Sequence, residues 1–162
     1  MHEFLKKLGP VINKIDFRRA ETKDLDRCTE IRGLTRDNPI DRATLIAIGV
    51  TEEAWAIELQ NDNYIGVVAE DSGEIIGYCF GDMQTGEILV LALLPKYEGV
   101  GLGSQLLSKV VEKLFSAGHS ELWLAASPNP QIRAHGFYRH MGWQPTNIFD
   151  NNGDEILKFR QI

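Results

Sequence analysis

The feature that most constrains this chain is a wholly apolar segment that leads, within a few residues, into three glycines. Residues 88–94 read ILVLALL, and the stretch PKYEGVGLGS that follows holds Gly99, Gly101 and Gly103. A strand can be apolar at every position when both of its faces are covered, as in the middle of an α/β sheet. We therefore predict a central strand over residues 88–94.

A helix is predicted directly after the glycines. Apolar residues recur every three or four positions from residue 102 to residue 115, and Gly118 is suited to end the helix. A strand that passes through a glycine loop into a helix exposes backbone N–H groups at the positive end of the helix dipole, which suits a phosphate. The alternative is that the glycines only make a tight turn.

Two familiar phosphate-binding loops do not fit this stretch. A Walker loop needs a lysine after its last glycine, whereas Ser104 and Gln105 follow Gly103. A dinucleotide fold needs an acidic residue at the end of the next strand to hold the ribose, whereas that strand ends in Ala125-Ala126-Ser127.

The rest of the chain predicts a mixed α/β fold. Helices are expected after Thr22, from the cap Thr51 to about Asn61, and from the cap Asn129 to Gly142. The remaining strands are expected at residues 15–19, 65–70, 74–83, 122–126, 143–148 and 155–160.

Composition limits the classes of protein to which the chain can belong. Its 162 residues suit one domain over residues 15–162, with residues 1–14 as an N-terminal arm. No apolar run reaches the length of about 18 residues needed for a membrane span, and the N-terminus lacks a secretory signal, so we expect a cytoplasmic protein. The net charge of −6 argues against nucleic acid or an anionic membrane as partner and favours a cationic ligand. The two cysteines are expected to be buried free thiols.

Residues 98–103, Glu-Gly-Val-Gly-Leu-Gly, resemble the acetyl-CoA loop Q/R-x-x-G-x-G/A of the GCN5-related N-acetyltransferases (GNAT). Residues 15–31 are similar to the first strand and helix of that family, and residues 134–143, AHGFYRHMGW, to its late helix. The resemblance covers residues 15–162. It implies a central, mostly antiparallel sheet of six to seven strands flanked by about four helices, with acetyl-CoA as co-substrate.

The resemblance also implies a set of cofactor-binding residues. Backbone amides of the glycine loop would hold the diphosphate of CoA, and the pantetheine would pair like an extra strand alongside the central strand. The family often has an asparagine where this chain has Gln131; Asn129, two residues earlier, is either its substitute or only a helix cap. The residues so implied are Leu91, Leu93, Val100, Gly101, Leu102, Gly103, Ser104, Asn129 and Gln131.

Glu98 departs from the family pattern, which has glutamine or arginine at this position. A carboxylate beside a diphosphate is repulsive unless it turns outward or pairs with a cation, for which Lys96 is the neighbouring candidate.

Two catalytic residues follow from the resemblance. Glu87 lies eleven residues before Glu98, where some relatives have a general base; a water chain as base, or a merely solvated carboxylate at position 87, is the alternative. The second base position known in relatives is Ala125 here. Tyr138 is similar to the family tyrosine that protonates the departing thiolate, although it could be a plain core aromatic. His135 and His140, five apart, complete no ligand set, so we predict no metal.

The predicted activity is transfer of an acetyl group to a primary amine of a small molecule or peptide, by direct attack in a ternary complex. The alternative is a non-catalytic acyl-CoA-binding or regulatory module. Transfer to aminoacyl-tRNA ranks low, because the chain has no marked basic patch. The resemblance places the acceptor site around Arg36, Asp37, Asn38, Trp55 and Phe149, and the N-terminal arm could support a homodimer.

Overall fold

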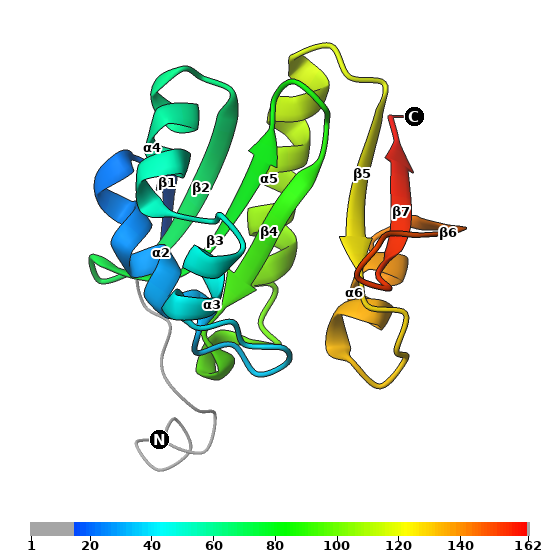
Figure 1. The fold of residues 1–162 in the computed structure, drawn as a ribbon, viewed down its shortest axis with the longest axis horizontal. Helices are drawn as coiled ribbons and strands as arrows, with labels where there is room; N and C mark the ends of the chain where they lie inside the picture. The colour runs from blue at the N-terminus through cyan, green and yellow to red at the C-terminus, as the bar shows by residue number, and fades with distance from the viewer. Residues whose placement is uncertain (1–14, 162) are drawn as a thin grey trace, which may run out of the picture.

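The computed structural model describes residues 15–161, so the expected N-terminal arm and any dimer contact made by it lie outside the described residues. Two antiparallel sheets stand side by side (Figure 1). The first has the order β1-β2-β3-β4 and the second the order β5-β7-β6. The strands are β1 (Ile15–Arg19), β2 (Tyr64–Asp71), β3 (Glu74–Asp82), β4 (Ile88–Leu93), β5 (Glu121–Ala126), β6 (Gln144–Phe149) and β7 (Glu155–Arg160).

Helices cover both faces of the first sheet (Figure 1). Helix α5 packs on β2, β3 and β4, while α2 and α4 pack on the other face. The helices are α2 (Leu25–Arg32), α3 (Arg42–Ala47), α4 (Glu52–Gln60), α5 (Leu102–Ser116) and α6 (Arg133–His140), with 3-10 turns at Thr22–Asp24 and Pro95–Tyr97. The predicted mixed α/β architecture, with a mostly antiparallel set of strands, is confirmed.

In the described part of the chain, residues 15–161, one parallel bridge joins the two sheets, between Glu87 and Trp123. The backbone N–H of Trp123 donates to the carbonyl of Gly86 at 3.2 Å, and its indole N–H donates to the carbonyl of Thr85 at 3.3 Å. Beyond this bridge β4 pairs only with β3 within residues 15–161. The expectation of a central strand covered on both faces is therefore wrong in part: only Ile88 and Ala92 of β4 are fully buried.

Of the three predicted helix starts, one is confirmed and two differ. The cap at Thr51 is confirmed, since its hydroxyl accepts from the N–H of Ala54 at 3.1 Å. The first helix instead begins with a 3-10 turn capped by Glu21, one residue before Thr22. Helix α6 begins three residues later than predicted, because the side-chain oxygen of Asn129 accepts from the N–H of Gln131 and closes a local turn. The short helix α3 was not predicted.

The apolar core has one cluster on each face of the first sheet. Leu106, Val110 and Leu114 of α5 belong to the cluster that continues under the second sheet, and Ile31 of α2 belongs to the other. Both cysteines are buried free thiols, as predicted. Burial raises the pKa of Cys28 to about 12 and also raises the pKa of Cys79. None of the helices within residues 15–161 is long and apolar enough to cross a bilayer.

A buried ion pair ties β1 to the start of α2. Asp24 is only 4% exposed, and its two oxygens accept from the two terminal nitrogens of Arg18, each at 2.8 Å. The carboxylate also accepts from the backbone N–H of Glu21 at 2.8 Å. Burial alone would raise the pKa of Asp24, but the hydrogen bonds from Arg18 and Glu21 outweigh it and leave the pKa lowered.

Asp24→Ala should lower the free energy of unfolding by about 2 kcal/mol at neutral pH, because it removes a buried carboxylate with three hydrogen bonds and leaves the Arg18 guanidinium with Glu70 as its remaining close partner. Since the folded-state pKa of Asp24 lies below its ordinary value of 3.8, the stabilisation is complete above that value and is lost as the pH falls through the folded-state pKa. Urea denaturation at pH 7 and in acid should show the difference between the two proteins shrinking in acid. Glu74→Ala removes an exposed partner of Arg27 and should cost less than about 1 kcal/mol; equal losses would contradict the assignment.

Candidate functional site

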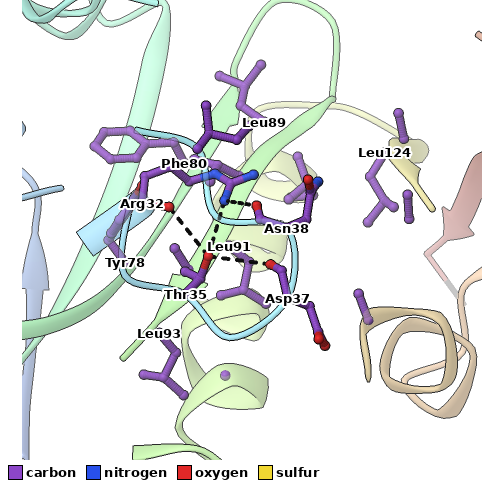
Figure 2. Close-up of a pocket in the computed structure, with 18 of the residues that line it drawn as sticks. Arg32, Thr35, Asp37, Asn38, Tyr78, Phe80, Leu89, Leu91, Leu93 and Leu124 are labelled. Carbon is purple, nitrogen blue, oxygen red and sulfur yellow. Dashed lines mark hydrogen bonds between the residues drawn. The ribbon is translucent and has the colours of Figure 1, made fainter. Parts of the chain in front are cut away.

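A cleft of about 680 Å³ opens where β4 and β5 separate. Leu89, Leu91 and Leu93 of β4 point into it, and Leu124 of β5 lies on the opposite side (Figure 2). The loop of residues 33–40, which joins α2 to α3, crosses β4 in the same view (Figure 2). The apolar face of β4 is therefore the floor of a cleft, which explains why the strand is apolar without being fully buried.

The glycine loop forms one end of this cleft. Gly99 and Gly101 have φ angles of 81° and 87°, in the left-handed region that favours glycine. Nothing lies within 4 Å of the point that a Cβ on Gly101 would occupy, so the space above this glycine is open. The hydroxyl of Tyr97 donates to the carboxylate of Asp71 at 2.5 Å and anchors the loop to β2. The tight-turn interpretation is thus correct for two glycines, and it does not exclude a ligand.

Helix α5 begins with free backbone donors. Its first backbone hydrogen bond runs from Gln105 to the carbonyl of Gly101 at 3.2 Å. The N–H groups of Leu102, Gly103 and Ser104 find no acceptor among residues 15–161. Gly101, Gly103 and Ser104 line the cleft, so these donors and the helix dipole suit the diphosphate of acetyl-CoA. The side chain of Leu102 is instead buried in the core, and Val100 is exposed outside the cleft.

Glu98 neither turns outward nor pairs with Lys96. Its side chain is 12% exposed, and its Oε2 atom lies 3.2 Å from a guanidinium nitrogen of Arg36 and 3.2 Å from one of Arg133. The ammonium of Lys96 lies over the ring of Tyr97, 5.2 Å from its centre. Two cations therefore neutralise the carboxylate that departs from the family pattern.

Tyr138 lies on α6 and lines the cleft. Its ring also packs edge-on against Phe137 and Trp143, with ring centres 5.2 and 6.2 Å away, so the residue is both a core aromatic and a cleft residue. Burial, with a smaller contribution from Cys79, raises the pKa of Tyr138, and the nearby Arg32 opposes the rise. The phenol is protonated at neutral pH and can donate a proton.

Glu87 lies at the bridge between the two sheets, half-buried and lining the cleft. Burial raises the pKa of its carboxyl, and the negative charges of Asp82 and Asp150 raise it further. An ordinary solvated carboxylate would not show this shift, so that interpretation of Glu87 fits the structure poorly. The shift brings the pKa of Glu87 closer to the pKa of an effective general base at neutral pH.

Four of the five residues expected around the acceptor site line the cleft. Arg36, Asp37, Asn38 and Trp55 line it, whereas Phe149 lies outside the lining and is 53% exposed. The turn after Phe149 contributes instead, through Asp150, Asn152 and Asp154.

Sequence reasoning missed Arg32 and Arg133, which also line the cleft. Arg32 donates to the carbonyl of Asn38 at 2.8 Å and to the hydroxyl of Thr35 at 3.3 Å, and so holds the loop of residues 33–40 (Figure 2). No local pattern marks either arginine: Arg133 contacts a residue 35 positions away in the sequence, and Arg32 contacts a loop whose course was not predicted. A possible signal was the unexplained carboxylate at position 98, which required a cation.

Two more of the predicted cofactor residues, besides Val100 and Leu102, lie apart from the cleft. Asn129 and Gln131 are exposed in the turn before α6 and are not among the residues that line it. His135 and His140 likewise have no metal-site partners: residues 15–161 hold no group of three or more His, Cys, Asp or Glu side chains placed to bind a metal ion.

Known proteins resemble this chain in sequence and in fold. Residues 26–143 match the model of the acetyltransferase (GNAT) family. A protein of Bacillus subtilis (strain 168), provisionally assigned as a ribosomal protein bS18-alanine N-acetyltransferase, is 28% identical over 153 residues, which cover 89% of this chain and 93% of that protein. The ribosomal protein bS18-alanine N-acetyltransferase of Haemophilus influenzae is 28% identical over 94 residues, 57% of this chain and 63% of that protein.

Among solved structures, the PaiA N-acetyltransferase of Thermoplasma acidophilum in complex with coenzyme A superposes with a TM-score of 0.78 at 18% identity. The superposition covers 92% of this chain and 100% of that one, and it establishes the likeness of fold. The family match spans β2 to β5, the glycine loop, and helices α5 and α6. The chain therefore belongs to the GNAT family of acetyltransferases, with acetyl-CoA as its acyl donor.

Proposed function

We propose that the protein acetylates a primary amine of a peptide or small molecule, with the α-amine of a protein N-terminus as the favoured acceptor. The observation that carries the proposal is that Glu87, Tyr138 and the glycine loop line one cleft. The favoured acceptor follows from the relatives named for the alanine of ribosomal protein bS18.

The residues of this chain divide the chemistry between them. Acetyl-CoA supplies a thioester carbonyl that an amine can attack and a thiolate that leaves. Glu87, with its raised pKa, takes the proton of the attacking amine, directly or through water. Tyr138 donates its phenolic proton to the departing sulfur. The free edge of β4 at Leu91 and Leu93 suits the amides of pantetheine, which can add to it as a strand would.

The acidic side of the cleft supports an acceptor that carries positive charge. Asp150, whose negative charge acts on Glu87, lines the cleft together with Asp154, and burial together with the charge of Asp150 raises the pKa of Asp154. Such crowding of carboxylates is relieved by an ammonium group or a basic side chain. This agrees with the net charge of −6.

The state of Cys28 supports direct attack rather than an acetyl-enzyme. Cys28 lines the cleft, so its thiol would be the natural nucleophile for a covalent intermediate. Its pKa of about 12 leaves it protonated at neutral pH, and the thiol is a poor nucleophile in that form. The amine is therefore expected to attack the donor within a ternary complex.

A non-catalytic acyl-CoA-binding module is the second candidate. Its support was the carboxylate at position 98, and the pairing of Glu98 with two arginines removes much of that support. A panel of amines, with acetyl-CoA and detection of released CoA, separates the candidates. It should include alanine-initiated peptides with basic residues, the same peptides with blocked N-termini, and linear polyamines. Turnover with the free peptides favours the proposal; binding of acetyl-CoA without turnover on any amine favours the module.

Glu87→Gln should lower kcat/KM by about 10²- to 10³-fold, because the amide cannot accept the proton. In the wild-type enzyme kcat/KM should rise as the pH rises through the pKa of Glu87, since the ionised form is the base. Asp150→Asn removes a neighbouring negative charge, and it should move this rise to lower pH. Initial rates between pH 5 and pH 9 measure both effects, and an unmoved profile in Asp150→Asn would argue against Glu87 as the titrating base.

Tyr138→Phe should lower kcat by about 10²-fold while acetyl-CoA binds as before, because the ring packing is kept and only the proton donor is lost. Steady-state rates and calorimetric affinity for acetyl-CoA check the two halves of this expectation. Phe137→Leu, which alters the adjacent ring and no proton donor, is the control for packing. Wild-type turnover in Tyr138→Phe would remove the assigned acid.

A further inference from the structure

Three charged side chains from distant parts of the sequence meet beside the glycine loop. Arg36 comes from the loop between α2 and α3, Glu98 from the glycine loop, and Arg133 from the start of α6. Both guanidinium groups contact the same carboxylate oxygen, Oε2, at 3.2 Å. The group of three carries a net charge of +1.

The position of this group points to the donor. A Cβ placed on Gly99 would lie 3.8 Å from a terminal guanidinium nitrogen of Arg133, so that guanidinium lies against the glycine loop. Arg36, Glu98 and Arg133 all line the cleft together with Gly101. The backbone N–H of Arg133 also donates to the carboxylate of Asp37 at 3.2 Å, which fixes the start of α6 next to the loop of residues 33–40.

The two arginines keep donors for a further anion. A guanidinium has five N–H groups, and the salt bridges to Glu98 engage one terminal nitrogen of each arginine. The side chains of Arg36 and Arg133 are 58% and 50% exposed, whereas that of Glu98 is 12% exposed. A ligand can therefore reach the arginines more easily than the carboxylate, and guanidinium groups match phosphate oxygens in charge and geometry.

We propose that Arg36 and Arg133 bind the diphosphate of acetyl-CoA through their side chains, and that Glu98 holds the two guanidinium groups beside the loop. The backbone amides of α5 would then supply one half of the diphosphate site and the arginines the other half. The carboxylate at position 98 is tolerated near the donor because its charge is more than balanced. The proposal rests on acetyl-CoA as the donor of the proposed function and is independent of the acceptor.

Isothermal titration of the full chain with CoA and with dephospho-CoA, which lacks the 3′-phosphate but keeps the diphosphate, tests the proposal. Arg133→Ala should weaken the binding of both ligands by about ten- to a hundred-fold. Arg36→Ala should weaken both in the same direction. Arg133→Lys should recover part of the affinity, and thermal melts should show each variant folded. Lys96→Ala, which removes a cation two residues from Glu98, is the matched control and should change affinity by less than about threefold.

A second measurement tests the part played by Glu98. In the Arg133→Ala protein, Glu98 keeps only one cation, so adding Glu98→Gln should recover part of the lost affinity. The proposal is overturned by a loss confined to CoA, which would assign the arginines to the 3′-phosphate, by a loss no larger than that of Lys96→Ala, or by no recovery in the double variant. Since no acceptor is present, failure to acetylate any amine would reject the proposed function and leave this result standing.

Discussion

The rest of the structure depends on the separation of β4 from β5 beyond the bridge at Glu87. A strand inside a sheet satisfies its backbone polar groups on both sides, whereas the edge of β4 beyond the bridge at Glu87 has a strand partner on one side only within the described chain. An open edge of this kind is normally a liability, and here a cleft lined by both sheets encloses it. The opening exposes the apolar face of β4 and places Glu87 at its apex.

The glycine loop follows from the same constraint. The chain leaves β4 at the edge of the cleft and must turn sharply to lay α5 back on the sheet, and the left-handed angles at Gly99 and Gly101 make that turn. The turn leaves the first amides of α5 at the end of the cleft, without acceptors of their own in residues 15–161. The same loop therefore makes a tight turn and leaves backbone donors free for an anion. The sequence alone presented the tight turn and the phosphate-binding loop as alternatives, but the two are compatible.

The parts of the site that depend on local patterns could be predicted from the sequence. The apolar strand, the glycines and the three- to four-residue period of α5 adjoin one another along the chain, so their order indicates their arrangement. The partners of Glu98 could not be predicted, because Arg36 and Arg133 reach it from loops whose course depends on the whole fold. The start of α6 was missed for a related reason: the pattern Asn129-Pro130 is suited to a helix cap, but the side chain of Asn129 closes a turn four residues before the helix starts. Helix α3 is too short for a periodic signal.

The burial of the two cysteines has a practical consequence for work with this protein. Cys79 is fully buried, and Cys28, although it lines the cleft, is only 4% exposed; both thiols remain uncharged at neutral pH, so neither is expected to undergo rapid disulfide exchange with a chromogenic aromatic disulfide. Such a reagent can therefore be present throughout the reaction, and the colour that develops will report only the thiol of the CoA released from acetyl-CoA. Because both thiols are buried, the folded chain should also tolerate air without the reducing agents that would spoil this readout.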